Sequence, residues 1–339
     1  MNVGVCDFPS DYEFPPRGYG SIERWLWAAA TGAREWGACV HLLGPGWRTD
    51  LPPGFGRRDV RLEDLGPGSI RERNLHELAL DLLIVGHEYP GLPAWRRTWQ
   101  AVGRDVATFQ HDSRFRHRQG TFDGTTSRLY CYSPEMMRRH QEHSPRQELC
   151  VQFGLEEEPP PAVRGQDLLW LGRVCSAKAP HLAVMAANRL GRRIRIVGPV
   201  HEPEYVHRYA HLFASKQVIW AGELGGAAKA GQLRDAAALV YTCAPSYVEA
   251  GAAVFGDALR AGTPVAALAW RAGTCPEVAL CDQTGSIAHV TEHRDQGVAA
   301  DALAAAIVTA ETLDPESVQA IGLARFDPVR HFETLAALQ

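Results

Sequence analysis

Residues Pro245 to Val265 read P-S-Y-V-E-A-G-A-A-V-F-G-D-A-L-R-A-G-T-P-V. The apolar run before them, Ala236 to Cys243, is typical of a buried strand. Gly262 to Pro264 is a helix-stop signal, and the apolar run from Val265 to Trp270 predicts a second buried strand. The stretch therefore predicts a loop and a helix between two buried strands, which is half of a nucleotide-binding unit in an α/β protein.

Two acidic residues, Glu249 and Asp257, stand eight positions apart in this loop and helix. If the helix begins near Ala250, the spacing separates them by about 12 Å along the axis and puts them on similar faces. An extended nucleotide-diphosphate sugar has a comparable reach, and both of its ends carry hydroxyls that a carboxylate can accept. The alternative interpretation is that Glu249 is a surface acid and that Asp257 pairs with Arg260 on a solvated face.

The first turn of the predicted helix carries only small residues. Gly251, Ala252 and Ala253 leave the first-turn amides uncovered, so phosphate oxygens could approach them closely. The positive end of the helix dipole favours an anion at the same place. We therefore expect a diphosphate to bind there.

The same stretch resembles the acid-x7-acid signature of the retaining GT-B nucleotide-sugar glycosyltransferases of glycosyltransferase family four, E-P-F-G-L-x-x-x-E-A followed by a small-Gly-Thr-Pro-Val turn. Glu249 matches the first acid, Asp257 replaces the second Glu, and Gly262 to Val265 matches the turn. Three positions depart from the signature, where Pro, an aromatic residue and Gly are replaced by Ala250, Gly251 and Ala252. The resemblance implies that Glu249 holds the sugar hydroxyls. Asp257 would hold the ribose, closely or through water because its side chain is short.

Length and composition indicate a two-domain globular protein. The chain has 339 residues, of which 45% are hydrophobic and 22% charged. The formal net charge of −4 does not favour binding of nucleic acid, which is itself negatively charged. The eight cysteines include no C-x-x-C pair, which favours free thiols in a reducing cytosol. The N-terminus predicts a strand rather than a signal peptide, and no apolar run approaches the roughly 20 residues that span a bilayer. We therefore expect a cytoplasmic protein that does not bind a membrane.

Short apolar runs alternate with helical patterns along both halves of the sequence, as a parallel sheet requires. The first half predicts strands at Val3–Phe8, Cys39–Leu43, Asp81–Gly86, Val106–Gln110, Arg128–Ser133 and Leu149–Phe153. The second half predicts strands at Leu168–Leu171, Ile194–Val197, Val218–Trp220, Leu239–Tyr241, Val265–Leu268 and Ile287–Val290. Between the halves, three acids and three prolines predict a stiff, solvated linker.

We therefore divide the chain into an N-terminal Rossmann-like domain on the acceptor side at 1–155, the linker at 156–166, a C-terminal nucleotide-sugar donor domain at 167–314, and a C-terminal helix at 315–339. This helix is interrupted at Asp327-Pro328 and could cross back to the first domain. The alternation supports the α/β class. The resemblance implies that the two doubly wound domains form a GT-B fold and face a cleft.

A pair of cations follows the first predicted strand of the second domain. Gly172, Arg173 and Lys178 resemble the family's G-R-x4-K element, whose Arg and Lys clamp the donor diphosphate. Fixed cations stabilise the charge that develops when the sugar–phosphate bond breaks. The Arg can bond two oxygens, whereas the Lys acts as a point charge. The alternative is an ordinary surface Arg and Lys in a loop.

A glycine-containing loop precedes the first predicted helix. Gly18, Gly20 and Ser21 resemble the family's G-Y-G-G-x-E-R loop, which implies approach to the donor phosphate. A dinucleotide fingerprint is not met, because Glu23 occupies the position of the third Gly. The alternative is a plain turn and helix cap.

Further candidates lie in the first domain. His111 matches the family's histidine at the end of a strand, which implies contact with the donor sugar, although a structural histidine is the alternative; His87 is a weaker candidate. Arg114 and Arg116 belong to a basic loop that could recognise an acidic acceptor or could simply be solvated. The run Trp95–Trp99 could mark a membrane-surface helix, but ordinary helix packing explains it better.

The resemblance also implies that Gly198 and Leu224 line the nucleotide base and ribose. The sequence has no D-x-D and no cluster with metal-ligand spacing, so we expect neither a metal nor another cofactor. The prediction is a retaining glycosyltransferase that moves a sugar from a nucleotide-diphosphate donor to an acceptor hydroxyl. The expected nucleotide is UDP. The likeness extends to enzymes that decorate oligosaccharide antibiotics of the avilamycin type.

Four alternatives remain open at this level. The chain could be a non-catalytic nucleotide-sugar binder, which the altered acid motif suggests. It could be a sugar-nucleotide epimerase of the same fold, or a phosphorylase, whose cofactor lysine would be Lys178, Lys216 or Lys229. An NAD-dependent oxidoreductase would require the glycine fingerprint that is not met.

Overall fold

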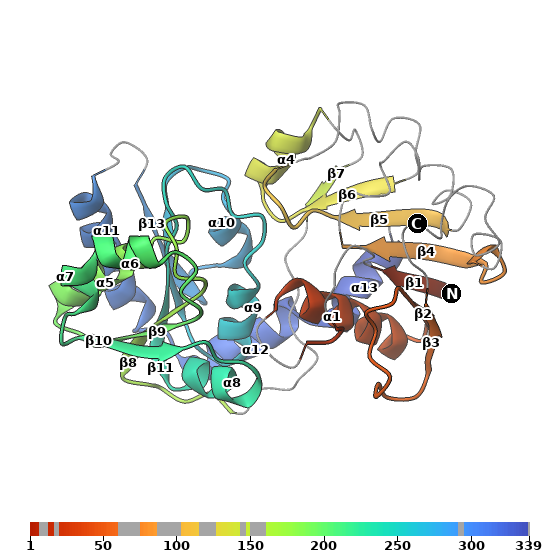
Figure 1. The fold of residues 1–339 in the computed structure, drawn as a ribbon, viewed down its shortest axis with the longest axis horizontal. Coiled ribbons are helices and arrows are strands. Elements are labelled where there is room, and N and C mark those ends of the chain that lie inside the picture. The colour runs from red at the N-terminus through yellow and green to blue at the C-terminus, as the bar shows by residue number, and fades with distance from the viewer. Residues whose placement is uncertain are drawn as a thin grey trace. The chain divides into compact units, whose positions relative to one another are not determined.

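The computed structural model describes residues 1–6, 13–16, 20–59, 75–86, 103–114, 127–142, 147–149, 161–290 and 295–337. These residues form two compact units. The first comprises the described parts of Met1–Pro16, Gly20–Glu156 and Asp327–Gln339, and the second those of Glu157–Phe326. Each unit is built on a parallel sheet (Figure 1).

The sheet of the first unit has the strand order β3-β2-β1-β4-β5-β6-β7. Its strands are β1 (Asn2–Cys6), β2 (Cys39–Leu43), β3 (Phe55–Arg58), β4 (Leu80–Val85), β5 (Gly103–Phe109), β6 (Ser127–Cys131) and β7 (Gln147–Leu149). Its helices among the described residues are α1 (Ile22–Glu35), α4 (Pro134–His140) and α13 (Pro328–Ala337). The sequence analysis missed β3, because this exposed edge strand reads F-G-R-R and has no apolar pattern.

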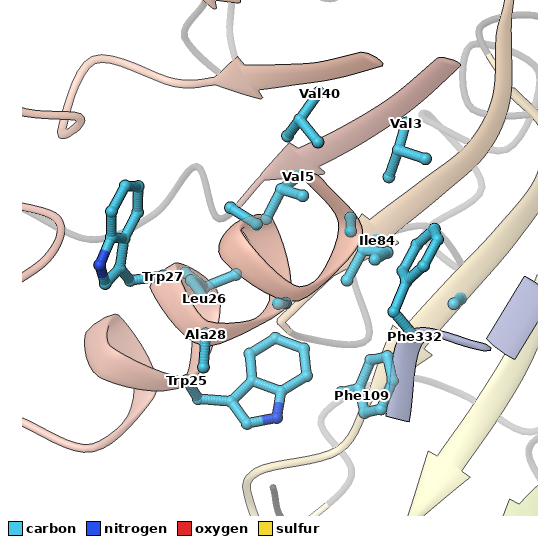
Figure 2. Close-up of a cluster of buried hydrophobic side chains, with 14 of the residues drawn as sticks. Val3, Val5, Trp25, Leu26, Trp27, Ala28, Val40, Ile84, Phe109 and Phe332 are labelled. Carbon is cyan, nitrogen blue, oxygen red and sulfur yellow. The ribbon is translucent and has the colours of Figure 1, made fainter. Parts of the chain in front are cut away.

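Two clusters of apolar side chains cover the two faces of this sheet. Leu82 and Ile84 of β4 belong to the cluster that packs under α1 and α13, together with Trp25 and Phe332 (Figure 2). Leu83 and Val85, which alternate with them along β4, belong to a second cluster on the opposite face. This division follows from the two-residue period of a strand and explains why residues 82–85 of β4 are all apolar and buried.

Helix α13 packs against α1 and belongs to the first unit. Gly32 of α1 permits this contact, since a Cβ atom there would lie 2.4 Å from the carbonyl oxygen of Pro328. Helix α12 (Pro315–Arg325) precedes it and packs against α9 (Ala253–Arg260) in the second unit. The helical segment at 315–339 divides into α12 and α13 at the interruption expected at Asp327-Pro328, and the two helices belong to different units.

The sheet of the second unit has the strand order β10-β9-β8-β11-β12-β13. Its strands are β8 (Asp167–Leu171), β9 (Ile194–Val197), β10 (Val218–Gly222), β11 (Ala236–Tyr241), β12 (Val265–Ala269) and β13 (Gly285–His289). The remaining helices are α5 (Pro180–Leu190), α6 (Pro203–Arg208), α7 (Ala210–Phe213), α8 (Gly226–Arg234), α10 (Cys275–Ala279) and α11 (Gln296–Ala310). Helices α5 and α11 pack together, and α8, α9 and α12 form a second group on the other side of the sheet (Figure 1).

In numbers counted from the first strand, both sheets begin with the order 3-2-1-4-5-6 of a doubly wound α/β fold. In the second unit the order reverses between β8 and β11. Ligands of open α/β sheets bind outside the carboxyl ends of the strands at this switch point. The loops after β8 and β11 both begin there, and they contain the two strongest motifs of the sequence.

Candidate functional site

A buried ion pair joins the two loops at the switch point. Lys178, in the loop after β8, contacts the carboxylate of Glu249, in the loop after β11. The hydroxyl of Tyr241, the last residue of β11, donates to the same carboxylate oxygen over 3.0 Å. The Lys178 ammonium also lies 4.9 Å from the centre of the Tyr247 ring, within the range of a cation–π contact. Only 18% of the Lys178 side chain and 9% of the Glu249 side chain remain exposed.

The pKa values of the neighbouring groups reflect this charge arrangement. Burial is the largest single influence on the pKa of Lys178 and lowers it, but the charge and hydrogen bond of Glu249, together with Tyr247 and Cys243, raise the pKa by more. Burial and the same carboxylate raise the pKa of Tyr241 well above its usual range. For Tyr247, burial and Glu249 raise the pKa, whereas Lys178 and Arg173 act in the opposite direction. Lys178 is therefore a fixed cation at physiological pH, and Arg173 lies within electrostatic reach of the Tyr247 hydroxyl.

The backbone around Lys178 is held from several sides. The Thr242 hydroxyl donates to the Lys178 carbonyl over 2.8 Å and accepts from the Trp170 indole over 2.9 Å. The next residue, Ala179, is buried and has a φ of 48°, in the left-handed region that non-glycine residues rarely adopt. Strain of this kind persists only where the surroundings enforce it, and it concentrates at functional sites. Arg173 is exposed, and among the described residues it takes part in no hydrogen bond or ion pair.

Glycines stand at the carboxyl ends of three adjacent strands. The Gly172 amide donates to the Val197 carbonyl over 3.0 Å, and the Gly198 amide donates to the Gly222 carbonyl over 2.7 Å. Gly198 has a φ of 138°, and a Cβ atom there would lie 1.8 Å from the Gly172 carbonyl oxygen. Leu224 follows β10 and is half-buried. The backbones at the ends of β8, β9 and β10 therefore pack closely together, and the approach of a ligand to Gly172 and Gly198 stays a prediction.

The helix that was expected to begin near Ala250 begins at Ala253. Ala252 is its N-cap with an extended backbone (φ −95°, ψ 99°), and the side chains of Ala250 and Ala252 are buried. Glu249 therefore lies in the loop and not on the helix, so the expected separation along one helix axis is wrong. Ala252 provides no side-chain cap for the first-turn amides, as the predicted anion site requires.

Asp257 forms an ion pair that the sequence analysis did not foresee. Its carboxylate accepts from Lys229 of α8 over 2.7 Å, and the residue is only 8% exposed. The solvated face of the alternative interpretation is wrong, because Asp257 and Arg260 are both buried, and Arg260 donates to the carbonyl of Phe326 over 3.4 Å. No short sequence pattern marks Lys229 as a partner of Asp257, because the pair depends on the packing of α8 against α9.

The candidates of the first unit lie at the ends of its own elements. His111 follows β5; its Nε2 lies 3.4 Å from the Tyr132 hydroxyl, and its ring meets Trp25 edge-on with 4.8 Å between the ring centres. Arg114 is exposed, and its amide donates to the Asp112 carboxylate over 2.9 Å. These contacts orient the His111 ring, and its assignment to a donor sugar stays a prediction.

The loop before α1 is described only in part. Ser21 is the exposed N-cap of α1, and its hydroxyl makes no cap hydrogen bond. A Cβ atom on Gly20 would lie 2.8 Å from the carboxylate of Glu23, which is buried and whose pKa burial raises. The other predictions here, Gly18, His87, Arg116 and Trp95–Trp99, lie outside the described residues.

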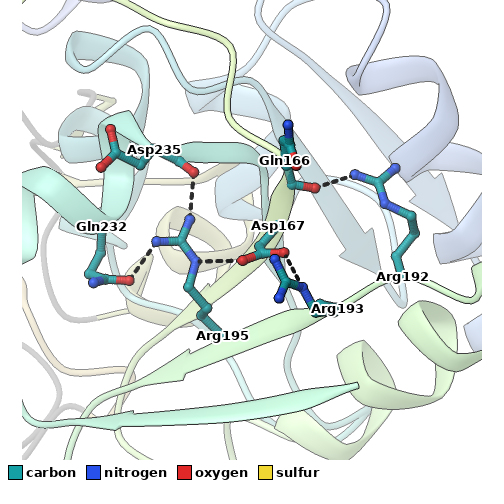
Figure 3. Close-up of polar contacts among 7 residues, drawn as sticks. All are labelled: Gln166, Asp167, Arg192, Arg193, Arg195, Gln232 and Asp235. Carbon is teal, nitrogen blue, oxygen red and sulfur yellow. Dashed lines mark hydrogen bonds and ion pairs between the residues drawn. The ribbon is translucent and has the colours of Figure 1, made fainter. Parts of the chain in front are cut away.

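A second group of arginines occupies the opposite edge of the second sheet, at the amino ends of β8 and β9 (Figure 3). Arg193 binds Asp167 over 2.8 Å, and Arg195 donates to the Gln232 side chain over 2.6 Å and to the Asp235 carbonyl over 2.7 Å. These guanidinium groups are used by the fold itself. Arg173, at the carboxyl edge, differs from them because it makes no such bonds among the described residues.

Among the residues that the structure describes, no three or more His, Cys, Asp or Glu side chains lie together in a way that could hold a metal ion. In the same part of the chain, no helix has both the length and the apolar character needed to cross a membrane.

Solved structures share this fold over the whole chain. AviGT4, a glycosyltransferase involved in avilamycin A biosynthesis, has a TM-score of 0.74 and 20% sequence identity, over 99% of this chain and 96% of its own. HepE from Anabaena, in complex with UDP and glucose, has a TM-score of 0.67 and 15% identity, over 99% and 100%. Sucrose-phosphate synthase from Thermosynechococcus elongatus has a TM-score of 0.66 and 16% identity, over 100% and 98%. No protein-family model matches the sequence, and no curated protein matches it.

The chain therefore has the GT-B fold, in which two Rossmann-like units are each built on a parallel sheet. The predicted α/β fold class is confirmed. At these identities the likeness establishes the fold alone.

Proposed function

We propose that this protein is a retaining glycosyltransferase that moves a sugar from a nucleotide diphosphate, UDP, to an acceptor hydroxyl. The observation that carries the proposal is the meeting of Lys178 and Glu249 at the switch point of the second sheet, beside Arg173. Cations and a carboxylate at this point match the two needs of such a donor. The cations suit the diphosphate, and the carboxylate suits the hydroxyls of the sugar.

The diphosphate would be held by three kinds of positive group. Arg173 is exposed and can bind two phosphate oxygens through its planar fork. Lys178 supplies a fixed ammonium that Glu249 keeps charged. The first-turn amides of α9, which has no side-chain cap at Ala252, supply hydrogen-bond donors. Because these groups neutralise the developing phosphate charge, the proposed reaction proceeds without a metal or another cofactor.

Glu249 would bind the hydroxyls of the donor sugar. One of its oxygens accepts from both Lys178 and Tyr241, and its other oxygen accepts no hydrogen bond among the described residues. The first oxygen fixes the carboxylate, and the second can accept from a ligand. Asp257 would contact the ribose, as the resemblance implies, with Lys229 setting the direction of its carboxylate.

In the proposed reaction, the acceptor oxygen bonds to the anomeric carbon on the face that the leaving group vacates. The bond from that carbon to the phosphate oxygen breaks, and the acceptor proton passes to the leaving phosphate. The anomeric configuration is retained, and the products are UDP and the glycosylated acceptor. The cations beside the diphosphate would lower the barrier, because its negative charge increases as the bond breaks.

The choice of UDP is supported by structures of the same fold that contain UDP or UDP-glucose, HepE among them. AviGT4 supports a role in the biosynthesis of an antibiotic oligosaccharide. The exposed Arg114 would suit an acidic acceptor. A cytoplasmic location agrees with a nucleotide-sugar donor.

Hydrolysis of UDP-glucose by the purified protein tests the proposal, because a glycosyltransferase slowly transfers its sugar to water. We expect release of UDP that falls by about a hundredfold or more in Lys178→Met and Glu249→Gln, the range seen when one stabilising donor is removed from a transition state. Lys216→Met is the control, because Lys216 is exposed and lies in the turn before β10. UDP release that is equal in all three variants would overturn the proposal.

A non-catalytic binder is the second candidate, and the Lys229–Asp257 pair favours it, since the second acid of the motif is already engaged. Tight binding of UDP-glucose without any release of UDP would support that function. Conversion of the bound sugar into its isomer would indicate the epimerase instead.

A further inference from the structure

The loop that leads to Glu249 carries three backbone carbonyls that point to two adjacent side chains. The Trp270 indole donates to the Cys243 carbonyl over 2.6 Å. The Arg271 guanidinium donates through one nitrogen to the Pro245 carbonyl over 2.7 Å and through the other to the Tyr247 carbonyl over 2.6 Å. Trp270 and Arg271 follow β12, the neighbour of β11, so both segments leave the sheet at the same edge.

Trp270 and Arg271 supply hydrogen bonds to three loop carbonyls that have no partner in regular secondary structure. Buried backbone carbonyls need partners, and those of residues 243, 245 and 247 lie outside any strand ladder or helix. The amides of the same loop are also bonded, since Ala244 donates to the Ala177 carbonyl over 2.9 Å and Tyr247 donates to the Ala244 carbonyl over 3.0 Å. The loop is therefore fixed through its carbonyls from β12 and through an amide from the Lys178 loop.

We propose that Arg271 is a positioning residue that sets Glu249 and the ring of Tyr247 against Lys178. Glu249 stands two residues beyond Tyr247, the last carbonyl that Arg271 holds. The Tyr247 ring faces the Lys178 ammonium. Movement of the Tyr247 backbone therefore displaces both partners of Lys178. This inference rests on the proposed function, because the contacts of Arg271 would serve to place Glu249 for binding of the donor sugar.

The fork of Arg271 is essential to this role. Two N–H groups in one rigid plane can hold two carbonyls that are two residues apart, whereas a lysine ammonium is a single point of donation on a flexible stem. Arg271→Lys should therefore retain the charge but hold only one carbonyl. Arg271→Met removes both bonds, and Trp270→Phe removes the third while keeping an aromatic ring.

The matched control is Arg192→Met. Arg192 donates to the Gln166 carbonyl over 2.5 Å, at the amino edge of the same sheet (Figure 3). It also donates to the Glu311 carboxylate over 2.9 Å. Its loss should weaken the second unit to a similar degree without affecting the loop before Glu249.

The first measurement is hydrogen exchange of the amides of residues 243–249 in the full-length protein. We expect exchange at least about tenfold faster in Arg271→Met than in the unmodified protein, with Arg271→Lys intermediate and Arg192→Met unchanged in this segment. The amides of β8 should exchange at the same rate in all of them. Unchanged exchange at 243–249 in Arg271→Met and Trp270→Phe would overturn the proposal, whether or not the protein is a glycosyltransferase.

The second measurement is the ratio of the affinities for UDP-glucose and UDP. A displaced Glu249 should weaken the sugar contact more than the nucleotide contact, so the ratio should fall by about tenfold in Arg271→Met and recover in part in Arg271→Lys. General loosening of the unit, as in Arg192→Met, should leave the ratio constant. A constant ratio in Arg271→Met would contradict the positioning role. If the unmodified protein binds neither UDP-glucose nor UDP, the proposed function fails. The exchange rates then decide alone whether Arg271 holds the loop before Glu249 in place.

Discussion

Replacement of Lys178 by Met should show how strongly the switch-point ion pair is coupled. At about 3 Å and an effective dielectric constant of about 20, two unit charges attract each other by roughly 5 kcal/mol. Removing one partner of a buried pair costs about 3–5 kcal/mol, because the other charge is left without compensation. The pair retains some solvent contact, with 18% and 9% of the two side chains exposed, and Tyr241 still donates to the carboxylate. We therefore expect Lys178→Met to lower the free energy of unfolding of the second unit by about 3 kcal/mol.

Urea unfolding at pH 7 measures this loss, followed by the fluorescence of Trp170 and the other tryptophans. The double variant Lys178→Met/Glu249→Gln closes a mutant cycle, because it removes both charges. We expect it to be more stable than Lys178→Met alone by at least about 1 kcal/mol, since no charge is then left unpaired. Losses that simply add in the double variant would refute the reasoning, because additivity means that the two side chains do not interact.

Three further predictions concern pH, backbone conformation and the ribose contact. Burial lowers the pKa of His181 to about 4 and that of His331 to about 3. As the pH falls, the unfolded chain binds these protons first, so the free energy of unfolding of each unit should fall by up to about 1.4 kcal/mol per pH unit from about pH 6.5 down to the folded-state pKa of its histidine. Urea unfolding of His181→Gln, whose free energy of unfolding should depend less steeply on pH, checks this. Gly198→Ala should destabilise the second unit by about 3 kcal/mol, because φ is 138° and the new Cβ meets a backbone oxygen, whereas Gly191→Ala, with φ 64° and open space, should cost about 1 kcal/mol; thermal unfolding compares them, and equal losses would contradict the packing. Asp257→Asn should reduce the preference for UDP over 2′-deoxy-UDP by about tenfold; an unchanged preference in binding titrations would remove Asp257 from the ribose contact.

The sequence predicted the fold well because a parallel sheet leaves a clear pattern. Strands such as β11 and β12 are buried on both faces and are therefore apolar at every position. The edge strand β3 has no such pattern, since its exposed residues include Arg57 and Arg58, and it was missed. The start of α9 was also misplaced, because Ala252 has an extended backbone although alanine by itself favours a helix.

The candidate site was predictable where its residues are local to a motif. Lys178 and Glu249 each follow a strand, and parallel topology brings the ends of β8 and β11 together. Their direct contact was not predicted, and neither was the role of Tyr241, which looked like one more apolar residue of a buried strand. Lys229 depends in the same way on the packing of two helices, which no short pattern encodes.

The central claim is that the cations at the switch point bind a donor diphosphate, and titration of UDP against Arg173→Met tests it most directly. Arg173 is exposed and makes no hydrogen bond among the described residues, so its replacement should leave the fold intact. Arg208→Met on α6 is the control, because Arg208 is also exposed. The account predicts that UDP binds the unmodified protein and Arg208→Met equally well, and binds Arg173→Met about tenfold or more weakly. Equal binding of UDP by all three proteins, or no binding by any of them, would contradict it.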